Sequence, residues 1–178
     1  MTKRKSKALS APQPEVAVAL APVVAALTEE SGRTGQRTAK LAAEILRDLN
    51  VGFVIPTAKQ RVALAMAYAR AEYVIYGKAF DIVRCSSTVD LNDSDSIFEH
   101  LADIVILEIK STNKKTVKPD FRGHFFAITA AELLVAQSLG KRYRFIFVNT
   151  LTRSHLELTL QQIFARSRGI YPTWSISF

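Results

Sequence analysis

Glu108 and Lys110 are the pair of residues whose types and spacing best suit a chemical reaction, because they lie two positions apart within the segment 103–112, after an apolar run. Side chains alternate faces along a β-strand, so Glu108 and Lys110 project from one face together with Ile104 and Ile106. Burying an unpaired charge is costly. The two groups must therefore pair with each other, reach water or hold a metal ion, and we expect the chemistry on this strand.

An acid on a neighbouring strand would complete a site for phosphodiester hydrolysis. Two carboxylates can hold Mg²⁺, which prefers oxygen ligands and keeps several waters. The lysine shares the face of the glutamate, so its ammonium can orient a water or neutralise charge on the phosphate. A solvent-exposed ion pair at the end of a strand is the simpler interpretation of the same two residues.

The residues around this pair resemble a nuclease superfamily. The segment 106–112, Ile-Leu-Glu-Ile-Lys-Ser-Thr, resembles the conserved strand of the PD-(D/E)XK nucleases. The segments 77–82, 126–132 and 139–144 resemble the nuclease-like domain at the C-terminus of protein NO VEIN and its bacterial relatives. Those relatives often occur in restriction and phage-defence systems. The resemblance covers roughly residues 73–150.

This resemblance implies roles for three residues. Asp81 and Glu108 would be the ligands of Mg²⁺ or Mn²⁺, and Lys110 would be the catalytic lysine. Asp81 precedes Glu108 by 27 residues, a longer interval than the pattern leads us to expect. Either an acidic loop is inserted between two paired strands, or the first metal ligand is one of four other acids: Asp90, Asp93, Asp95 or Asp103.

The elements that must position these residues predict an α/β fold, a central mixed sheet flanked by helices. The resemblance implies that its core is restriction-endonuclease-like. We expect helices at 38–49 and 57–70, the second with its buried face at Val62, Ala65, Met66 and Ala69. Another helix starts at Thr129. Thr57 with Gln60 and Thr129 with Glu132 have the spacing of capping boxes. For Glu132, capping is the preferred interpretation over catalysis.

Strands are expected at 51–55, at 103–112, at 145–149 and at 156–160, and residues 73–86 are expected to form a hairpin or one long bent strand with a turn or bulge at Gly77. An aromatic-rich edge strand is expected at 171–178. The apolar run 145–149 has no polar face and is predicted to be a central strand. We expect a basic tail at 1–13, an N-terminal helical segment at 14–56 and the nuclease-like domain at 57–178.

A net charge of +8 favours an anionic partner, and nucleic acid is the first candidate. The basic residues expected to contact phosphates flank the strand of Glu108: Lys114, Lys115, Lys118, Arg122, Arg142 and Arg144. An ordinary solvated loop is the alternative. The single cysteine, Cys85, fits a reducing cytoplasm, and no stretch predicts a membrane span.

The function that the sequence predicts is a Mg²⁺-dependent DNA endonuclease of the PD-(D/E)XK type, in defence or restriction. RNA is the alternative substrate, and the partners expected beyond DNA are a second copy of the chain or a larger defence complex. The alternative function is a nuclease fold without catalysis, which binds nucleic acid or serves in assembly. The interval between Asp81 and Glu108 is what favours this alternative.

Overall fold

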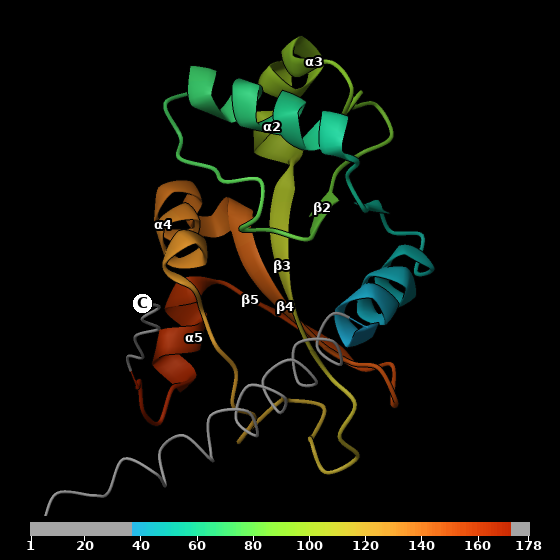
Figure 1. Ribbon diagram of the computed structural model, residues 1–178, viewed down its shortest axis with the longest axis vertical. Coiled ribbons are helices and arrows are strands. Elements are labelled where there is room, and N and C mark those ends of the chain that lie inside the picture. The colour runs from blue at the N-terminus through green and yellow to red at the C-terminus, as the bar shows by residue number, and fades with distance from the viewer. Residues whose placement is uncertain (1–36, 172–178) are drawn as a thin grey trace, which may run out of the picture. The chain divides into compact units, whose positions relative to one another are not determined.

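Strand β3 (Val105–Thr112), which carries Glu108 and Lys110, is the central strand of a five-stranded sheet in a computed structural model that describes residues 37–171 (Figure 1). The sheet order is β1-β2-β3-β4-β5. The other strands are β1 (Phe53–Val54), β2 (Ile82–Arg84), β4 (Tyr143–Asn149) and β5 (His155–Leu158). β3 and β4 are parallel, and the remaining neighbours are antiparallel. The predicted α/β class with a mixed sheet is confirmed.

Strand alternation separates two apolar cores, as the sequence of β3 predicts. Ile104 and Ile106 belong to the larger core, while Leu107 and Ile109 belong to the smaller one. β4 divides in the same way, with its aromatic residues in the larger core and its aliphatic residues in the smaller one. Glu108 and Lys110 therefore project on the side of the larger core.

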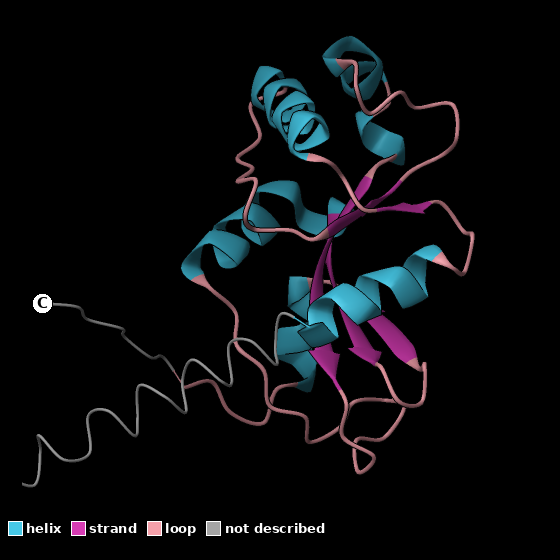
Figure 2. Ribbon diagram, turned by 45° about the vertical axis from the view of Figure 1, so that its right-hand side comes forward, coloured by secondary structure: helices cyan, strands magenta, loops and turns pink. Residues whose placement is uncertain are grey.

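Helices cover both faces of the sheet (Figure 2). A helix at residues 37–47 packs on the smaller core, whereas α2 (Ala58–Arg70), α4 (Ala130–Leu139) and α5 (Leu160–Arg166) contribute to the larger one. The short helix α3 (Ser94–Glu99) and a 3₁₀ turn (Leu101–Asp103) lie in the connection between β2 and β3. A second 3₁₀ turn (Gly140–Arg142) links α4 to β4.

Three helices begin with capping boxes. Those at Thr57 and at Thr129 were expected from the sequence and are confirmed, and a third opens α5. In each, the N-cap threonine hydroxyl accepts from the backbone of the third helical residue, whose side chain accepts from the backbone of the threonine. The box satisfies two amide donors that the first turn of a helix leaves unpaired.

The buried face predicted for α2 is wrong. Val62 and Met66 are more than half exposed, while the helix packs through Ala63, Leu64, Ala67 and Tyr68. Two apolar stripes run along this helix, each with residues four positions apart, so periodicity cannot decide between them. The contact of Tyr68 with Tyr73 in the larger core belongs to the stripe that packs.

The hairpin predicted over 73–86 is also wrong. Residues 73–81 form an irregular loop, and only Ile82–Arg84 is a strand. The loop has its own anchors: Tyr73 N donates to the Tyr68 carbonyl at 3.0 Å, and the Tyr143 hydroxyl donates to the carbonyl of Ala79. These contacts replace the strand ladder that the composition suggests.

The residues from Thr38 onward form one compact unit, in which the helix at 37–47 and β1 pack with the sheet. The sequence placed these residues in a separate segment that ended at residue 56. The expected tail at 1–13, the part of the N-terminal helical segment before residue 37 and all but the first residue of the strand expected at 171–178 lie outside the described residues. Among the helices described, none combines the length and apolar character needed to cross a bilayer.

Candidate active site

Asp81 lies beside Glu108 although the two are far apart in the sequence. Ile82 is paired with Leu107 in the antiparallel ladder of β2 and β3, so Asp81 comes one step before the ladder, next to Glu108. Two hydrogen bonds fix this position: Asp81 N donates to the Leu107 carbonyl at 3.0 Å, and Ile109 N donates to Asp81 Oδ2 at 3.0 Å. The Asp81 carboxylate therefore acts as an additional acceptor for the backbone of β3, just before the first residue of β2.

Lys110 lies between two carboxylates. Its Nζ is 3.0 Å from Oε1 of Glu108 and 2.8 Å from Oε2 of Glu132. Glu132 comes from the first turn of α4, and Glu108 from β3. The Lys110 ammonium also lies 5.9 Å from the centre of the Phe145 ring on β4. Two of the three donors of the ammonium are thus directed at carboxylates.

Arg61 holds the loop that delivers Asp81. Its guanidinium donates to the carbonyls of Gly77 at 2.8 Å, Phe80 at 2.6 Å and Asp81 at 3.1 Å, and it stacks on the Phe80 ring. Partial burial lowers the pKa of Arg61, while the charges of Asp81 and Glu108 oppose that shift. Arg61 is therefore a second cation near the carboxylates, and its contacts are to the backbone.

Burial governs the electrostatics of Glu108, which is 8% exposed. Desolvation, followed by the nearby charge of Asp81, raises the pKa of Glu108 to about 8, although Lys110 acts in the opposite direction. Burial also raises the pKa of Tyr143, with smaller contributions from the three carboxylates. Carboxylates that repel one another in a partly buried site favour a cation among them.

The donor set fits Mg²⁺. Asp81 uses Oδ2 and Glu108 uses Oε1 in hydrogen bonds, and within the described chain no protein group donates to their other oxygens. Among the described residues, neither of these two oxygens is a buried polar atom left without a hydrogen-bond partner. No group of three His, Cys, Asp or Glu side chains is arranged to hold a metal ion in residues 37–171. A site with two carboxylates is the type that Mg²⁺ completes with waters and substrate phosphates.

The five candidate acids differ in their contacts. The segment between β2 and β3 is an inserted connection with its own helix, as one of the two expectations had it. Asp90 accepts from Asn92, Asp93 caps α3, and Asp95 pairs with Arg70. Asp103 lies in the 3₁₀ turn before β3. Among the five candidates, the described contacts place Asp81 against the backbone of β3.

Four of the predicted phosphate-contacting residues lie in the loop after β3. Lys114, Lys115, Lys118 and Arg122 are exposed, and Arg122 pairs with Asp120 at 3.8 Å. The loop begins directly after Thr112, the last residue of β3, and Figure 1 shows it continuing beyond the end of that strand. Its charges are thus available to an anion that approaches along β3.

The other two predicted contacts are engaged elsewhere. Arg142 donates to the Tyr73 hydroxyl and stacks on the Tyr73 ring, at 4.5 Å from the ring centre. Arg144 pairs with Glu157 at 3.2 Å, on the face of the sheet opposite Glu108. The structure therefore does not bring Arg144 to the carboxylates.

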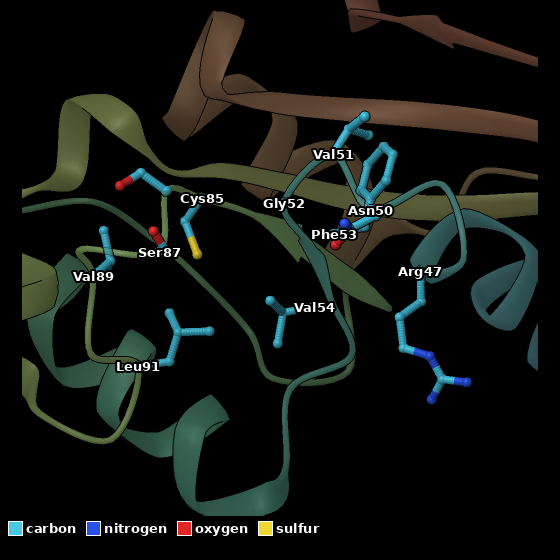
Figure 3. Close-up of a pocket in the computed structure, with 11 residues that line it drawn as sticks. Arg47, Asn50, Val51, Gly52, Phe53, Val54, Cys85, Ser87, Val89 and Leu91 are labelled. Atoms are coloured by element: carbon cyan, nitrogen blue, oxygen red, sulfur yellow. The ribbon is translucent and has the colours of Figure 1, made fainter.

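A surface pocket of about 670 Å³ lies elsewhere, around the loop before β1 and the start of the connection after β2 (Figure 3). Arg47, Phe53, Val54, Cys85 and Leu91 are among its lining residues. None of the acids or the lysine of the candidate site lines it. The candidate site is the charged cluster beside β3, defined as Asp81, Glu108, Lys110 and Glu132.

Two residues of the site were missed by sequence reasoning. Arg61 was not among the expected site residues, and its partners are backbone carbonyls far along the chain. Glu132 was interpreted as a cap, which is confirmed but incomplete. The sequence held one signal for Glu132: it is an acid at a capping position where glutamine serves in the other two boxes.

Comparison of the chain with protein families, with curated proteins and with solved structures finds no match.

Proposed function

We propose that this protein is a Mg²⁺-dependent endonuclease that hydrolyses phosphodiester bonds of DNA, with a restriction-endonuclease-like core. The observation that carries the proposal is the meeting of Asp81, Glu108 and Lys110, with Asp81 Oδ2 bound to the amide that follows Glu108. An acid beside a Glu-x-Lys strand is the arrangement of PD-(D/E)XK nucleases, which the sequence resembles. The order of the sheet, an antiparallel β1-β2-β3 followed by a helix and a parallel β4, supports the same proposal.

Asp81 and Glu108 would hold the metal ion through the two carboxylate oxygens that lack protein donors. Bound there, Mg²⁺ supplies charge stabilisation of the phosphate and a more acidic water. The Lys110 ammonium faces the same space and stabilises negative charge on the phosphate in the transition state. The water oxygen bonds to phosphorus, the bond from phosphorus to the leaving sugar oxygen breaks, and a proton is transferred to that oxygen.

The residues around Lys110 limit water at the site. Phe145 and Phe147 on β4 lie beside Glu108 and Lys110 in the parallel ladder, and both aromatic side chains are buried. Electrostatic interactions gain strength where water is excluded. The side chain of Lys110 is 13% exposed, so most of the water around it is excluded by the protein.

The exposed lysines after β3 support a nucleic-acid substrate. Lys114, Lys115 and Lys118 add positive charge where the strand of Glu108 ends. Phosphate contacts of this kind provide affinity without reading a sequence. They suit DNA and RNA equally, and the resemblance to restriction-associated domains is what favours DNA.

A second candidate is a nuclease fold that binds nucleic acid without cutting it. One observation favours it: Lys110 already pairs with Glu108, and α4 supplies a further carboxylate to the same ammonium. Such a cluster is partly charge-balanced without a metal ion.

Plasmid cleavage separates the two candidates. The wild-type protein is incubated with supercoiled DNA and Mg²⁺ or Mn²⁺, beside Asp81→Asn, Glu108→Gln and Lys110→Met. The endonuclease proposal expects cutting by wild type and at least about 10²-fold slower cutting by each variant. Salt-dependent DNA binding without cutting under either metal would establish the binding module instead.

A further inference from the structure

The three capping boxes found in residues 37–171 differ in whether the third helical residue is an amide or an acid, and the one acid lies beside Lys110. The third helical residue is Gln60 in α2 and Gln162 in α5, but Glu132 in α4. Glutamine therefore completes the box as well as glutamate does in this fold. A cap alone does not explain why α4 carries an acid.

The contacts of Glu132 show a second role for its charge. Oε2 accepts from Thr129 N at 3.1 Å and from Lys110 Nζ at 2.8 Å. The side chain is 8% exposed, so the ammonium is its principal source of charge compensation. Charge-assisted hydrogen bonds of this length are among the strong ones, and partial burial strengthens them further.

Thr129 fixes the orientation of Glu132, and Glu132 in turn fixes Lys110. The backbone amide of Thr129 donates to Oε2 of Glu132 at 3.1 Å, and the backbone amide of Glu132 donates to the Thr129 hydroxyl at 3.2 Å, so the box holds both the side chain and the backbone of Glu132. Lysine is a flexible side chain with several rotatable bonds. Its ammonium is held in one place only if partners on more than one element bind it.

We infer that Glu132 is a positioning residue that holds the Lys110 ammonium at the reacting phosphate, with the capping box as its support. The inference rests on the proposed nuclease function. When a metal ion occupies Glu108, Glu132 remains as the carboxylate that keeps Lys110 in place. Glu132 itself does not touch the substrate.

Glu132→Gln is the informative variant, because glutamine keeps the cap and removes the charge. We expect its cleavage kcat to fall about 10²-fold with little change in the KM for DNA, as for other misplaced catalytic groups. Thr159→Ala is the matched control: it removes the threonine of the equivalent box on α5, lowers the unfolding temperature and leaves Glu132 and its own cap unchanged. Its kcat should stay within about threefold of wild type, far less than the loss expected from displacing a catalytic group.

A double-mutant cycle tests whether Glu132 acts through Lys110. In a Lys110→Met background, Glu132→Gln should lower residual cleavage no further, because the group it positions is gone. A full additional loss in that background would overturn the inference. So would a wild-type kcat in Glu132→Gln alone.

A measurement without DNA keeps this test separate from the nuclease proposal. The ¹⁵N resonance of the Lys110 ammonium, assigned by its absence in Lys110→Met, should be sharp in wild type and in Thr159→Ala. It should be lost to exchange in Glu132→Gln. If wild type does not cut DNA, the nuclease proposal fails while this signal still decides the positioning role; an unchanged signal in Glu132→Gln refutes that role.

Discussion

The amide of Ile109 donates a hydrogen bond to the carboxylate of Asp81 at 3.0 Å, across an interval of 28 residues that includes a helix of its own. The bond places an acid from the start of β2 against the peptide that follows Glu108. It also shows that Asp81 has a structural role besides its proposed role as a metal ligand, so its substitutions must be chosen to separate the two.

Asp81→Asn should weaken metal binding without unfolding the protein. The asparagine carbonyl can still accept from Ile109 N, while the charge is lost. We expect a fall of at least about tenfold in Mn²⁺ affinity by calorimetry, and a change in unfolding free energy below about 1 kcal/mol. Asp81→Ala is the comparison, because it removes the acceptor too and should cost about 1–3 kcal/mol. Equal metal affinity in wild type and Asp81→Asn would argue against Asp81 as a ligand.

The stability of the metal-free protein should depend on the protonation of Glu108. Burial and Asp81 raise its folded-state pKa to about 8 from an ordinary 4.5. The folded protein then binds this proton more tightly than the unfolded chain does, so the stability contribution is complete below about pH 4.5 and is lost as the pH rises through about 8. Glu108→Gln should remove this contribution to the slope of unfolding free energy against pH.

Urea unfolding at several pH values measures how the stability of wild type and of Glu108→Gln changes with pH. We expect wild type to lose a few kcal/mol relative to Glu108→Gln between about pH 4.5 and pH 8. Saturating Mg²⁺ should reduce the loss, because it binds the charged carboxylate. Parallel profiles for the two proteins would show that Glu108 titrates normally.

Arg61 should stabilise the loop that presents Asp81. Arg61→Ala leaves the carbonyls of Gly77, Phe80 and Asp81 without their shared donor, and we expect a loss of about 2–4 kcal/mol in unfolding free energy. Amide exchange in residues 77–82 should accelerate by more than the global change explains.

Arg70 is the control for Arg61, since it lies on the same helix. It pairs with Asp95 at the surface, and about half of its side chain is exposed. Arg70→Ala should cost less than about 1 kcal/mol. A similar loss of unfolding free energy in both variants would mean that the three hydrogen bonds of Arg61 stabilise the protein no more than the surface ion pair of Arg70 does.

The lysines after β3 should contribute to DNA affinity through phosphates. Lys114→Gln with Lys115→Gln should weaken binding and reduce the slope of log K against log salt by up to about 2. The control pair is Lys40→Gln with Arg47→Gln. It removes the same charge from exposed positions of the helix at 37–47, which packs on the face of the sheet opposite Glu108. Fluorescence anisotropy at several salt concentrations distinguishes the pairs, and identical slopes would place the DNA elsewhere.

The sequence alone determined the features that depend on local spacing. The alternation of β3 assigned Glu108 and Lys110 to one face and Leu107 with Ile109 to the other, because successive side chains of a strand must point in opposite directions. The boxes at Thr57 and Thr129 followed from the same kind of short-range geometry.

Only the tertiary structure decided which distant groups meet these residues. Asp81 was one of five candidate acids until the register of β2 against β3 placed it beside Glu108. Arg61 gave no local signal, since its partners are carbonyls of an irregular loop. Glu132 had a complete explanation as a cap until α4 packed near Lys110. Contacts across long intervals depend on how helices and strands pack, and the spacing of residues along the chain does not specify that packing.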